Sequence, residues 1–237
     1  MLIRIRSALF SVFFVLFVTV TGILCLPLLL FGRGIIRKTV QLWARITLAG
    51  LKWITGISYR IEGAQNIPEG GALIAANHQS MWETIALFML MPKPAMIFKK
   101  ELLHIPIYGW WARFSGNIAI DREGGAKALR SMTRKVKERV AAGDQVIVFP
   151  EGTRSPIGKR TAFKPGIAGL YAATKASCIP AAHDSGRYWR FPGSQKKPGV
   201  ITLKILPAIA PGLDRKNFTR TLKAHIEAAR PDLEGLS

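Results

Sequence analysis

The sequence predicts an α/β fold, with a mixed, mostly parallel sheet flanked by helices and preceded by membrane-anchoring helices. Two observations lead to this prediction. From about residue 57 onward, short β-rich runs alternate with helical patterns, which is typical of a sheet covered by helices. Before that point the chain is apolar and basic, and its first acidic residue is Glu62. We therefore expect an N-terminal anchor over residues 1–56 and an α/β domain over residues 57–237.

The first part of the anchor is the segment 7–32, which carries no charged residue. As one helix, its 26 residues would be about 39 Å long, enough to cross a hydrocarbon core of roughly 30 Å. It is too long for a cleaved signal peptide and lacks a clean small-x-small cleavage site. Gly22 and Pro27 leave a second possibility, a kinked or re-entrant helix that stays in one leaflet. Basic residues flank the segment on both sides, so its orientation is open.

The second part of the anchor, residues 35–57, is apolar but interrupted by four basic residues. That much charge suits a helix lying in the membrane interface, with Trp43 and Trp53 at head-group level, better than a membrane span. The whole chain has a net charge of +20, which predicts an anionic partner, either nucleic acid or acidic lipid. The apolar N-terminus favours membrane phospholipids, and the wide spread of the basic residues argues against nucleic acid.

Seven runs in the second part of the chain are expected to be strands: 58–61, 72–76, 95–98, 117–120, 145–149, 178–182 and 200–206. Helical patterns cover residues 124–142, 165–176 and 216–229. Residues 185–199 form a polar segment punctuated by glycine and proline, which we expect to be a loop near the lipid or an ordinary solvated loop. Of the two cysteines, Cys25 lies in the apolar segment and Cys178 in an expected strand, so neither a disulfide nor a zinc site is predicted.

The segment 77–83 follows an expected strand and opens a helix, and it contains His78 and Glu83. Positions five apart in a helix point about 140° apart, so His78 must lie in the loop before the first turn if the two side chains are to meet. Ser80 is well placed as the N-cap of that helix. A carboxylate that contacts an imidazole can fix its tautomer and stabilise its protonated form. Taken alone, this spacing is equally compatible with a histidine at a helix cap that has no chemical role.

Two further segments place cations after strands. Residues 149–155 follow an apolar run and form a glycine-containing turn, where Arg154 offers a forked donor suited to phosphate and Glu151 could orient it. Lys100 follows another strand, and Arg122 follows the next one. Cations at strand ends are common anion-binding groups in α/β folds, although solvated lysines and a surface ion pair are the ordinary alternatives.

These segments occur in one order along the chain: residues 77–83 (NHQSMWE), 99–122, 149–155 (FPEGTRS) and 179–181 (IPA). In this order the chain resembles the glycerolipid acyltransferase family, most closely its bacterial members that act on 1-acyl-glycerol-3-phosphate. The resemblance covers roughly residues 57–211. It departs from the family pattern at Glu83, where the motif usually has aspartate; a glutamate reaches one methylene further and costs more side-chain entropy to fix.

The resemblance implies an enzyme that moves a fatty acyl group from acyl carrier protein or acyl-CoA to the sn-2 hydroxyl of lysophosphatidate, giving phosphatidate. His78 would be the general base and Glu83 its orienting partner, with no covalent intermediate, no metal and no cofactor. The acceptor site would include Lys100, Arg122, Glu151, Gly152, Thr153, Arg154 and Pro180. The supply of acyl thioesters implies a site on the cytoplasmic side of a bacterial inner membrane. Another lysolipid acceptor, such as a lyso-ornithine lipid, and a non-catalytic lipid-binding or scaffold protein are the alternatives.

Overall fold

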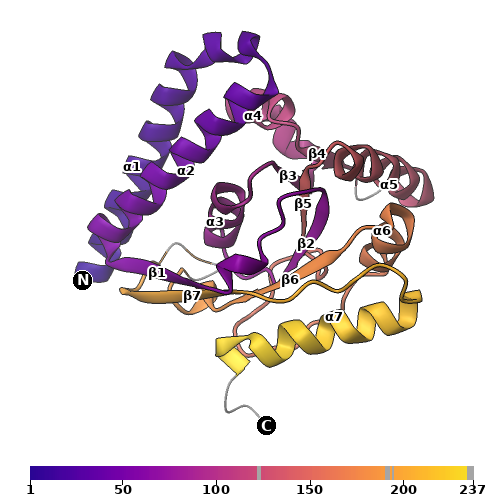
Figure 1. The fold of residues 1–237 in the computed structure, drawn as a ribbon. Helices are drawn as coiled ribbons and strands as arrows, with labels where there is room; N and C mark the ends of the chain where they lie inside the picture. The colour runs from indigo at the N-terminus through magenta and orange to yellow at the C-terminus, as the bar shows by residue number, and fades with distance from the viewer. Residues whose placement is uncertain (122–123, 190–192, 194, 234–237) are drawn as a thin grey trace.

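The computed structural model describes residues 1–121, 124–189, 193 and 195–233. Its centre is a seven-stranded sheet in the order β1-β7-β6-β2-β5-β3-β4 (Figure 1). The neighbouring strands are parallel except for β6 and β7. The strands are β1 (Ile57–Glu62), β2 (Ala72–Ala76), β3 (Pro94–Lys99), β4 (Ile118–Ile120), β5 (Gln145–Val148), β6 (Cys178–His183) and β7 (Gly199–Ile205). The mixed, mostly parallel sheet and all seven expected strands are therefore confirmed.

Helices cover both faces of this sheet because its central strands are apolar on both sides. In β2, Ile74 packs into one hydrophobic cluster while its neighbours Leu73 and Ala75 pack into the other. The first cluster includes residues of α1 (Leu2–Leu24), α2 (Arg33–Thr55) and α3 (Trp82–Leu90). The second includes residues of α5 (Gly125–Ala141), α6 (Gly166–Thr174) and α7 (Arg215–Ala229), which confirm the three expected helices. The short helix α4 (Tyr108–Phe114) lies beside α2 (Figure 1).

The two N-terminal helices, α1 and α2, form an antiparallel hairpin (Figure 1). The expectation of one 26-residue helix over residues 7–32 is wrong, because α1 ends at Leu24 and a 3₁₀ helix, η1 (Leu26–Phe31), follows. Pro27 is the physical reason: it lacks a backbone N–H and its ring clashes with the preceding turn of an α-helix. The whole of α1, from Leu2 to Leu24, has 23 residues and corresponds to about 34 Å.

By length and composition, α1 qualifies as a membrane-spanning helix. Exposed apolar side chains occur along its whole length, among them Leu9, Leu16 and Ile23. The second helix of the hairpin is held by the α/β domain: Gln41 donates to the carbonyl of Met91 at 2.8 Å. The exposed apolar face of α1 indicates contact with lipid rather than with water.

Residues 185–199 are not an ordinary solvated loop throughout, because Trp189 and Lys196 pack against α1. Trp189 and Lys196 are buried and paired across an isolated β-bridge. The ring of Phe10, a residue of α1, meets the Trp189 ring edge-on at 5.5 Å, and the Lys196 ammonium lies 5.2 Å from the Phe10 ring. Trp189 and Lys196 therefore connect α1 of the hairpin to the α/β domain.

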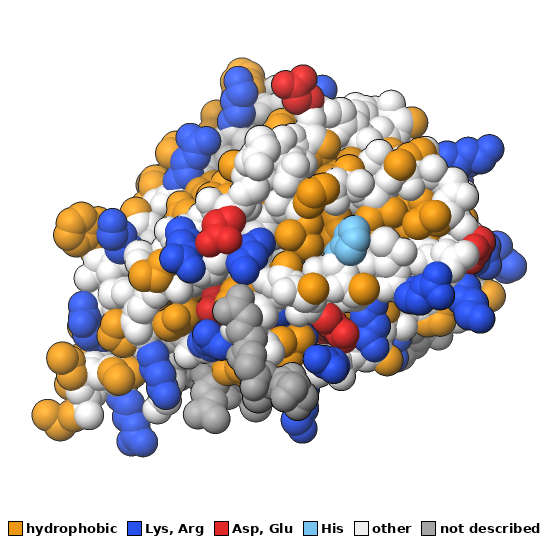
Figure 2. Space-filling model, turned by 60° about the horizontal axis from the view of Figure 1, so that its bottom comes forward, with side chains coloured by type: hydrophobic (Ala, Val, Ile, Leu, Met, Phe, Trp, Pro, Cys, Tyr) orange, Lys and Arg blue, Asp and Glu red, His pale blue; other side chains and the backbone are white. Residues whose placement is uncertain are grey.

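The basic residues do not form a single stripe on the face shown in Figure 2. Lys and Arg side chains are spread over that face between hydrophobic ones, with fewer acidic side chains among them. A nucleic-acid-binding surface usually gathers its basic residues along one face or helix. The face shown in Figure 2 therefore lacks the single basic stripe that is typical of such a surface.

Candidate active site

The carboxyl ends of β2, β5 and β6 lie side by side, because β5 and β6 both pair in parallel with β2. The loop after β2 carries His78, and α3 begins only at Trp82. The expectation that His78 lies in the loop before the helix is therefore confirmed. The same edge of the sheet receives the turn after β5 and the segment after β6. In open α/β sheets, this edge is where ligands generally bind.

His78 and Glu83 are in direct contact. The Nδ1 atom of His78 lies 2.7 Å from Oε1 of Glu83. The imidazole also stacks on the ring of Phe149, with 4.2 Å between the ring centres and 17° between the planes. The His78 side chain is 15% exposed, whereas the Glu83 side chain is fully buried. Because Nδ1 faces a carboxylate, it carries the proton of the neutral ring, and Nε2 is the atom that remains to accept one.

Glu83 accepts five hydrogen bonds in this buried position. Oε1 receives the backbone N–H groups of Gln79 and Ser80, each at 2.8 Å, in addition to the His78 ring. Oε2 receives the hydroxyls of Ser80 at 2.7 Å and Ser185 at 2.8 Å. A buried carboxylate held by this many donors has little freedom to turn, so it fixes the orientation of the imidazole.

Ser80 and Glu83 also form a capping box at the start of α3. The Ser80 hydroxyl accepts from the N–H of Trp82 at 2.9 Å, and the Glu83 carboxylate accepts from the N–H of Ser80. Ser80 thus performs the expected capping role, one residue before the N-cap at Met81. The glutamate serves both the helix terminus and the histidine, which explains how a longer side chain than aspartate fits here.

The same contacts decide the charge of Glu83. Burial alone would raise its pKa, but the imidazoles of His183 and His78 and the hydrogen bonds from His78 and Ser80 lower its pKa well below the usual range. Burial has the opposite effect on His183, where it lowers the pKa. At neutral pH Glu83 is therefore a carboxylate, and the buried His183 nearby is a neutral imidazole.

The lowered pKa of Glu83 predicts a pH dependence of stability. A glutamate in the unfolded chain titrates near pH 4.3, well above Glu83 in the folded protein. The stabilisation that the carboxylate provides is complete above the unfolded value and is lost as the pH falls toward the folded one. Between about pH 5 and about pH 3, we expect the thermal unfolding midpoint of the wild type to fall more steeply than that of Glu83→Gln. Parallel curves in differential scanning calorimetry would contradict an ionised, well-partnered Glu83.

The turn after β5 is bonded directly to the histidine loop. The N–H of Ser155 donates to the carbonyl of His78 at 2.7 Å, and Nε of Arg154 donates to the carbonyl of Ser80 at 3.1 Å. The buried Glu151 receives the His78 N–H at 3.4 Å and the Ser155 hydroxyl. Burial raises the pKa of Glu151, an effect that the Ser155 hydrogen bond opposes. Glu151 therefore supports the histidine loop, and its role in orienting Arg154 stays a prediction.

The remaining expected acceptor residues occupy different surroundings. Gly152 has φ +71°, a left-handed conformation that favours glycine, and Thr153 next to it is exposed. Lys100 forms an ion pair of 2.5 Å with Asp121. Pro180 is buried in the central strand β6, opposite Ala75 of β2. Arg122 lies outside the described residues.

The sequence analysis did not identify several residues that belong to the site. His183 is the last residue of β6 and Ser185 follows it, and both come more than a hundred positions after the loop they support. Asn77 and His183 exchange hydrogen bonds through the Asn77 side chain and the His183 backbone, both at 2.9 Å. Near the C-terminus, Asp232 accepts from the Gln79 side chain at 2.8 Å. The one signal in the sequence was the position of His183 at the end of an expected strand, which places it at the edge formed by the carboxyl ends of the strands.

The arrangement is suited to proton transfer at Nε2 of His78. A neutral imidazole held by a carboxylate can take a proton from a hydroxyl and give it to a leaving group. Among the described residues, no group of three or more His, Cys, Asp or Glu side chains has a geometry that could hold a metal ion. Arg154, whose Nε donates to the carbonyl of Ser80, is a cation next to the histidine loop and of a type that can bind an anion.

Known proteins share both the sequence and the fold. A family model described as Acyltransferase matches residues 58–184. A 1-acyl-sn-glycerol-3-phosphate acyltransferase of Pseudomonas aeruginosa is 37% identical over 183 residues, covering 77% of this chain and 71% of that protein. The protein of the same name from Cocos nucifera is 29% identical over 171 residues, covering 71% of this chain and 55% of its own length. The crystal structure of the 1-acyl-sn-glycerophosphate (LPA) acyltransferase PlsC from Thermotoga maritima, 24% identical, has the same fold, with a TM-score of 0.82 and 98% of both chains covered.

The family match spans His78, Glu83, the turn after β5 and the end of β6, which together form the site described above. It covers more than half of the chain, and the Pseudomonas relative is similar over most of its own length as well. The chain therefore belongs to the acyltransferase family and is an enzyme of that family.

Proposed function

We propose that this enzyme transfers a fatty acyl group from acyl carrier protein or acyl-CoA to the sn-2 hydroxyl of 1-acyl-glycerol-3-phosphate. The product is phosphatidate, the precursor of membrane phospholipids. The observation that carries the proposal is the contact of 2.7 Å between Nδ1 of His78 and the buried carboxylate of Glu83, which leaves Nε2 as the base. Relatives named as 1-acyl-sn-glycerol-3-phosphate acyltransferases support the choice of acceptor.

The reaction follows from the geometry of this pair. Nε2 of His78 takes the proton of the acceptor hydroxyl while the oxygen of that hydroxyl attacks the carbonyl carbon of the thioester. The tetrahedral adduct then collapses with cleavage of the C–S bond, and the imidazolium returns the proton to the leaving thiolate. The ester bond forms as the thioester bond breaks, so no oxidant, metal or second base is needed. Glu83 stabilises the imidazolium during the step.

The nucleophile in this proposal is the substrate. The hydroxyls of Ser80 and Ser185 donate to Glu83, so they help to hold the carboxylate. Cys178 lies in a core strand, where burial raises the pKa of its thiol and keeps it protonated. Direct attack by the acceptor hydroxyl on the thioester requires no acyl-enzyme.

The acceptor phosphate would meet the cations that follow the strands. Arg154 is the strongest candidate, because the hydrogen bond from its Nε to Ser80 fixes the guanidinium beside the histidine loop. Lys100 and Arg122 follow β3 and β4 and would complete the cationic environment. Gly152 would allow the backbone of the turn to approach the phosphate closely.

We further propose that residues 1–56 anchor the enzyme and that residues 57–237 form the catalytic domain. α2 ends at Thr55, and β1 begins at Ile57. The apolar face of α1 would enter the membrane, and the active site would face the cytoplasmic side of a bacterial inner membrane, where acyl thioesters are made. The lipid acceptor could then reach His78 without leaving the bilayer surface.

A comparison of acceptors tests the proposed substrate. Purified enzyme with one acyl thioester is supplied in turn with lysophosphatidate, lysophosphatidylcholine and lyso-ornithine lipid, and the acylated products are measured by mass spectrometry. We expect kcat/KM to be highest for lysophosphatidate, because its phosphomonoester pairs best with an arginine fork. Turnover of lyso-ornithine lipid without turnover of lysophosphatidate would reject the proposed acceptor while leaving the acyltransferase chemistry intact.

A further inference from the structure

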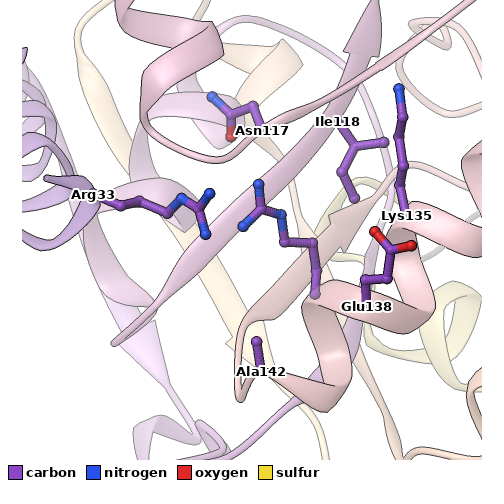
Figure 3. A pocket seen from close by; sticks show the side chains of 7 residues that line it. Arg33, Asn117, Ile118, Lys135, Glu138 and Ala142 are labelled. Carbon is purple, nitrogen blue, oxygen red and sulfur yellow. The ribbon is translucent and has the colours of Figure 1, made fainter.

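A second cationic site lies between the hairpin and the domain. A cavity of about 490 Å³ is lined by residues of α2, α5 and the segment that leads into β4 (Figure 3). Arg33 reaches toward this cavity from α2, and Lys135 and Glu138 come from α5 (Figure 3). Arg139 of α5 also lines it. Cations from two separate helices therefore share one hollow.

The two arginines approach each other closely. A Cβ placed on Gly116 would lie 2.9 Å from Cδ of Arg33 and 3.4 Å from Cζ of Arg139, so both side chains pass over the same glycine. Burial lowers the pKa of Arg139, and the charges of Arg33 and Arg37 lower it further, against the opposite effect of Asp144. Like charges held this close favour an anion between them.

The cations at this cavity, Arg33, Arg37, Lys135 and Arg139, outnumber the two nearby carboxylates, Glu138 and Asp144. Asp144 is held by Arg37 at 2.5 Å and by Arg139 at 3.7 Å. Within the described part of the chain, Arg33 forms no ion pair with a carboxylate, and its side chain is exposed. Its guanidinium is therefore available to a ligand.

The cavity lies away from the candidate active site. Asn117 and Ile118 line it at the amino end of β4, and Ala142 lines it just before the amino end of β5. His78 follows the carboxyl end of β2, which is parallel to β5. The two sites thus lie at opposite ends of the parallel strands, so the cavity is separate from the reacting groups.

Both segments that enter the cavity come directly from exposed apolar surface. Arg33 follows the 3₁₀ helix η1, in which Leu30 is 86% and Phe31 is 63% exposed. Asn117 follows α4, in which Trp110 is 50% and Phe114 is 49% exposed. Apolar and aromatic side chains next to arginines are typical of protein surfaces at the level of lipid head groups.

We propose that this cavity binds the head-group phosphate of an anionic membrane phospholipid, held between Arg33 and Arg139. The acyl chains of that lipid would lie against η1 and α4. The lipid would act as a fixed ligand that joins α2 to α5, separate from the acyl acceptor. It would couple the docking of the hairpin to the presence of an anionic bilayer.

The experiment is native mass spectrometry of the full chain released from an uncharged detergent and titrated with a short-chain phosphatidylglycerol. We expect Arg33→Gln and Arg139→Gln each to weaken binding by about tenfold or more, since each removes a charge-assisted hydrogen bond. Arg134→Gln removes an exposed charge from the same helix α5 and is expected to leave binding within about twofold. Arg154→Gln removes the candidate phosphate ligand of the active site and controls for lipid bound there. The exposed position of Arg33 keeps that variant informative if Arg139→Gln proves unstable.

Three results would overturn the proposal. The first is unchanged phosphatidylglycerol binding in folded Arg33→Gln and Arg139→Gln proteins. The second is equally tight binding of short-chain phosphatidylcholine, which has no net negative charge. The third is displacement of the lipid by an equal concentration of glycerol 3-phosphate, which would assign the cavity to a soluble phosphate.

Discussion

The His78→Ala enzyme is expected to lose about 10²- to 10⁴-fold in kcat/KM for lysophosphatidate, the range that general-base catalysis usually contributes. The variant removes the only ring atom placed to take the acceptor proton in the proposed mechanism. The side chain is partly exposed and lies in a loop, so its removal leaves the core intact. The measurement is the initial rate of phosphatidate formation by equal amounts of folded wild-type and variant protein.

His225→Ala is the matched control for that experiment. His225 is an exposed residue of α7, so its replacement is expected to leave the rate within about twofold of wild type. Addition of imidazole to His78→Ala offers a second check, because a small base can occupy the space beside Glu83. A folded His78→Ala enzyme with wild-type activity would remove His78 from the mechanism.

The second large effect is expected for Glu83→Gln, with a loss of roughly 10²- to 10⁴-fold in kcat. A glutamine oxygen in the place of Oε1 can still accept from the N–H groups of Gln79 and Ser80. Its amide nitrogen, in the place of Oε2, can donate to the hydroxyls of Ser80 and Ser185. The local hydrogen bonds survive, and what disappears is the negative charge that stabilises the protonated His78. The predicted signature is a large fall in kcat with little change in KM.

The Glu83→Asp variant distinguishes the effect of the carboxylate charge from the effect of side-chain length. The aspartate keeps the charge but is one methylene shorter, so it cannot satisfy the ring, the two backbone N–H groups and the two hydroxyls at the present distances. We expect this variant to retain more activity than Glu83→Gln and to be less stable than wild type. Parallel steady-state kinetics and thermal unfolding of both variants measure these two effects. An active Glu83→Gln enzyme would show that the carboxylate charge is dispensable.

The strands were predictable because their signal is local. Residues 72–76 and 145–148 are uninterrupted apolar or β-rich runs, and burial on both faces selects such runs. The contact between His78 and Glu83 was predictable for a similar reason, since five residues and a strand-to-helix junction constrain both side chains. The family motif then supplied the chemistry that this spacing alone left open.

The parts that escaped prediction depend on distant contacts. Ser185 reaches Glu83 across a separation of 102 positions, and Asp232 reaches Gln79 across 153 positions, so no local pattern records either contact. The burial of Lys196 against Phe10 reverses what its polar neighbours suggested, because α1 covers that segment only in the folded chain. The end of α1 has a local signal in Pro27, and the break after Leu24 agrees with the kinked alternative to one helix over residues 7–32.

The central claim, direct acyl transfer to lysophosphatidate by the His78 and Glu83 pair, is tested most directly by thiol release from an acyl thioester. Purified wild-type enzyme is incubated with acyl-CoA or acyl carrier protein, with and without lysophosphatidate, and both thiol and phosphatidate are quantified. The mechanism predicts thiol release only when the acceptor is present, in equal amount to the phosphatidate formed. Thiol release without acceptor together with an acylated protein mass, or acceptor-dependent release without phosphatidate, would contradict it.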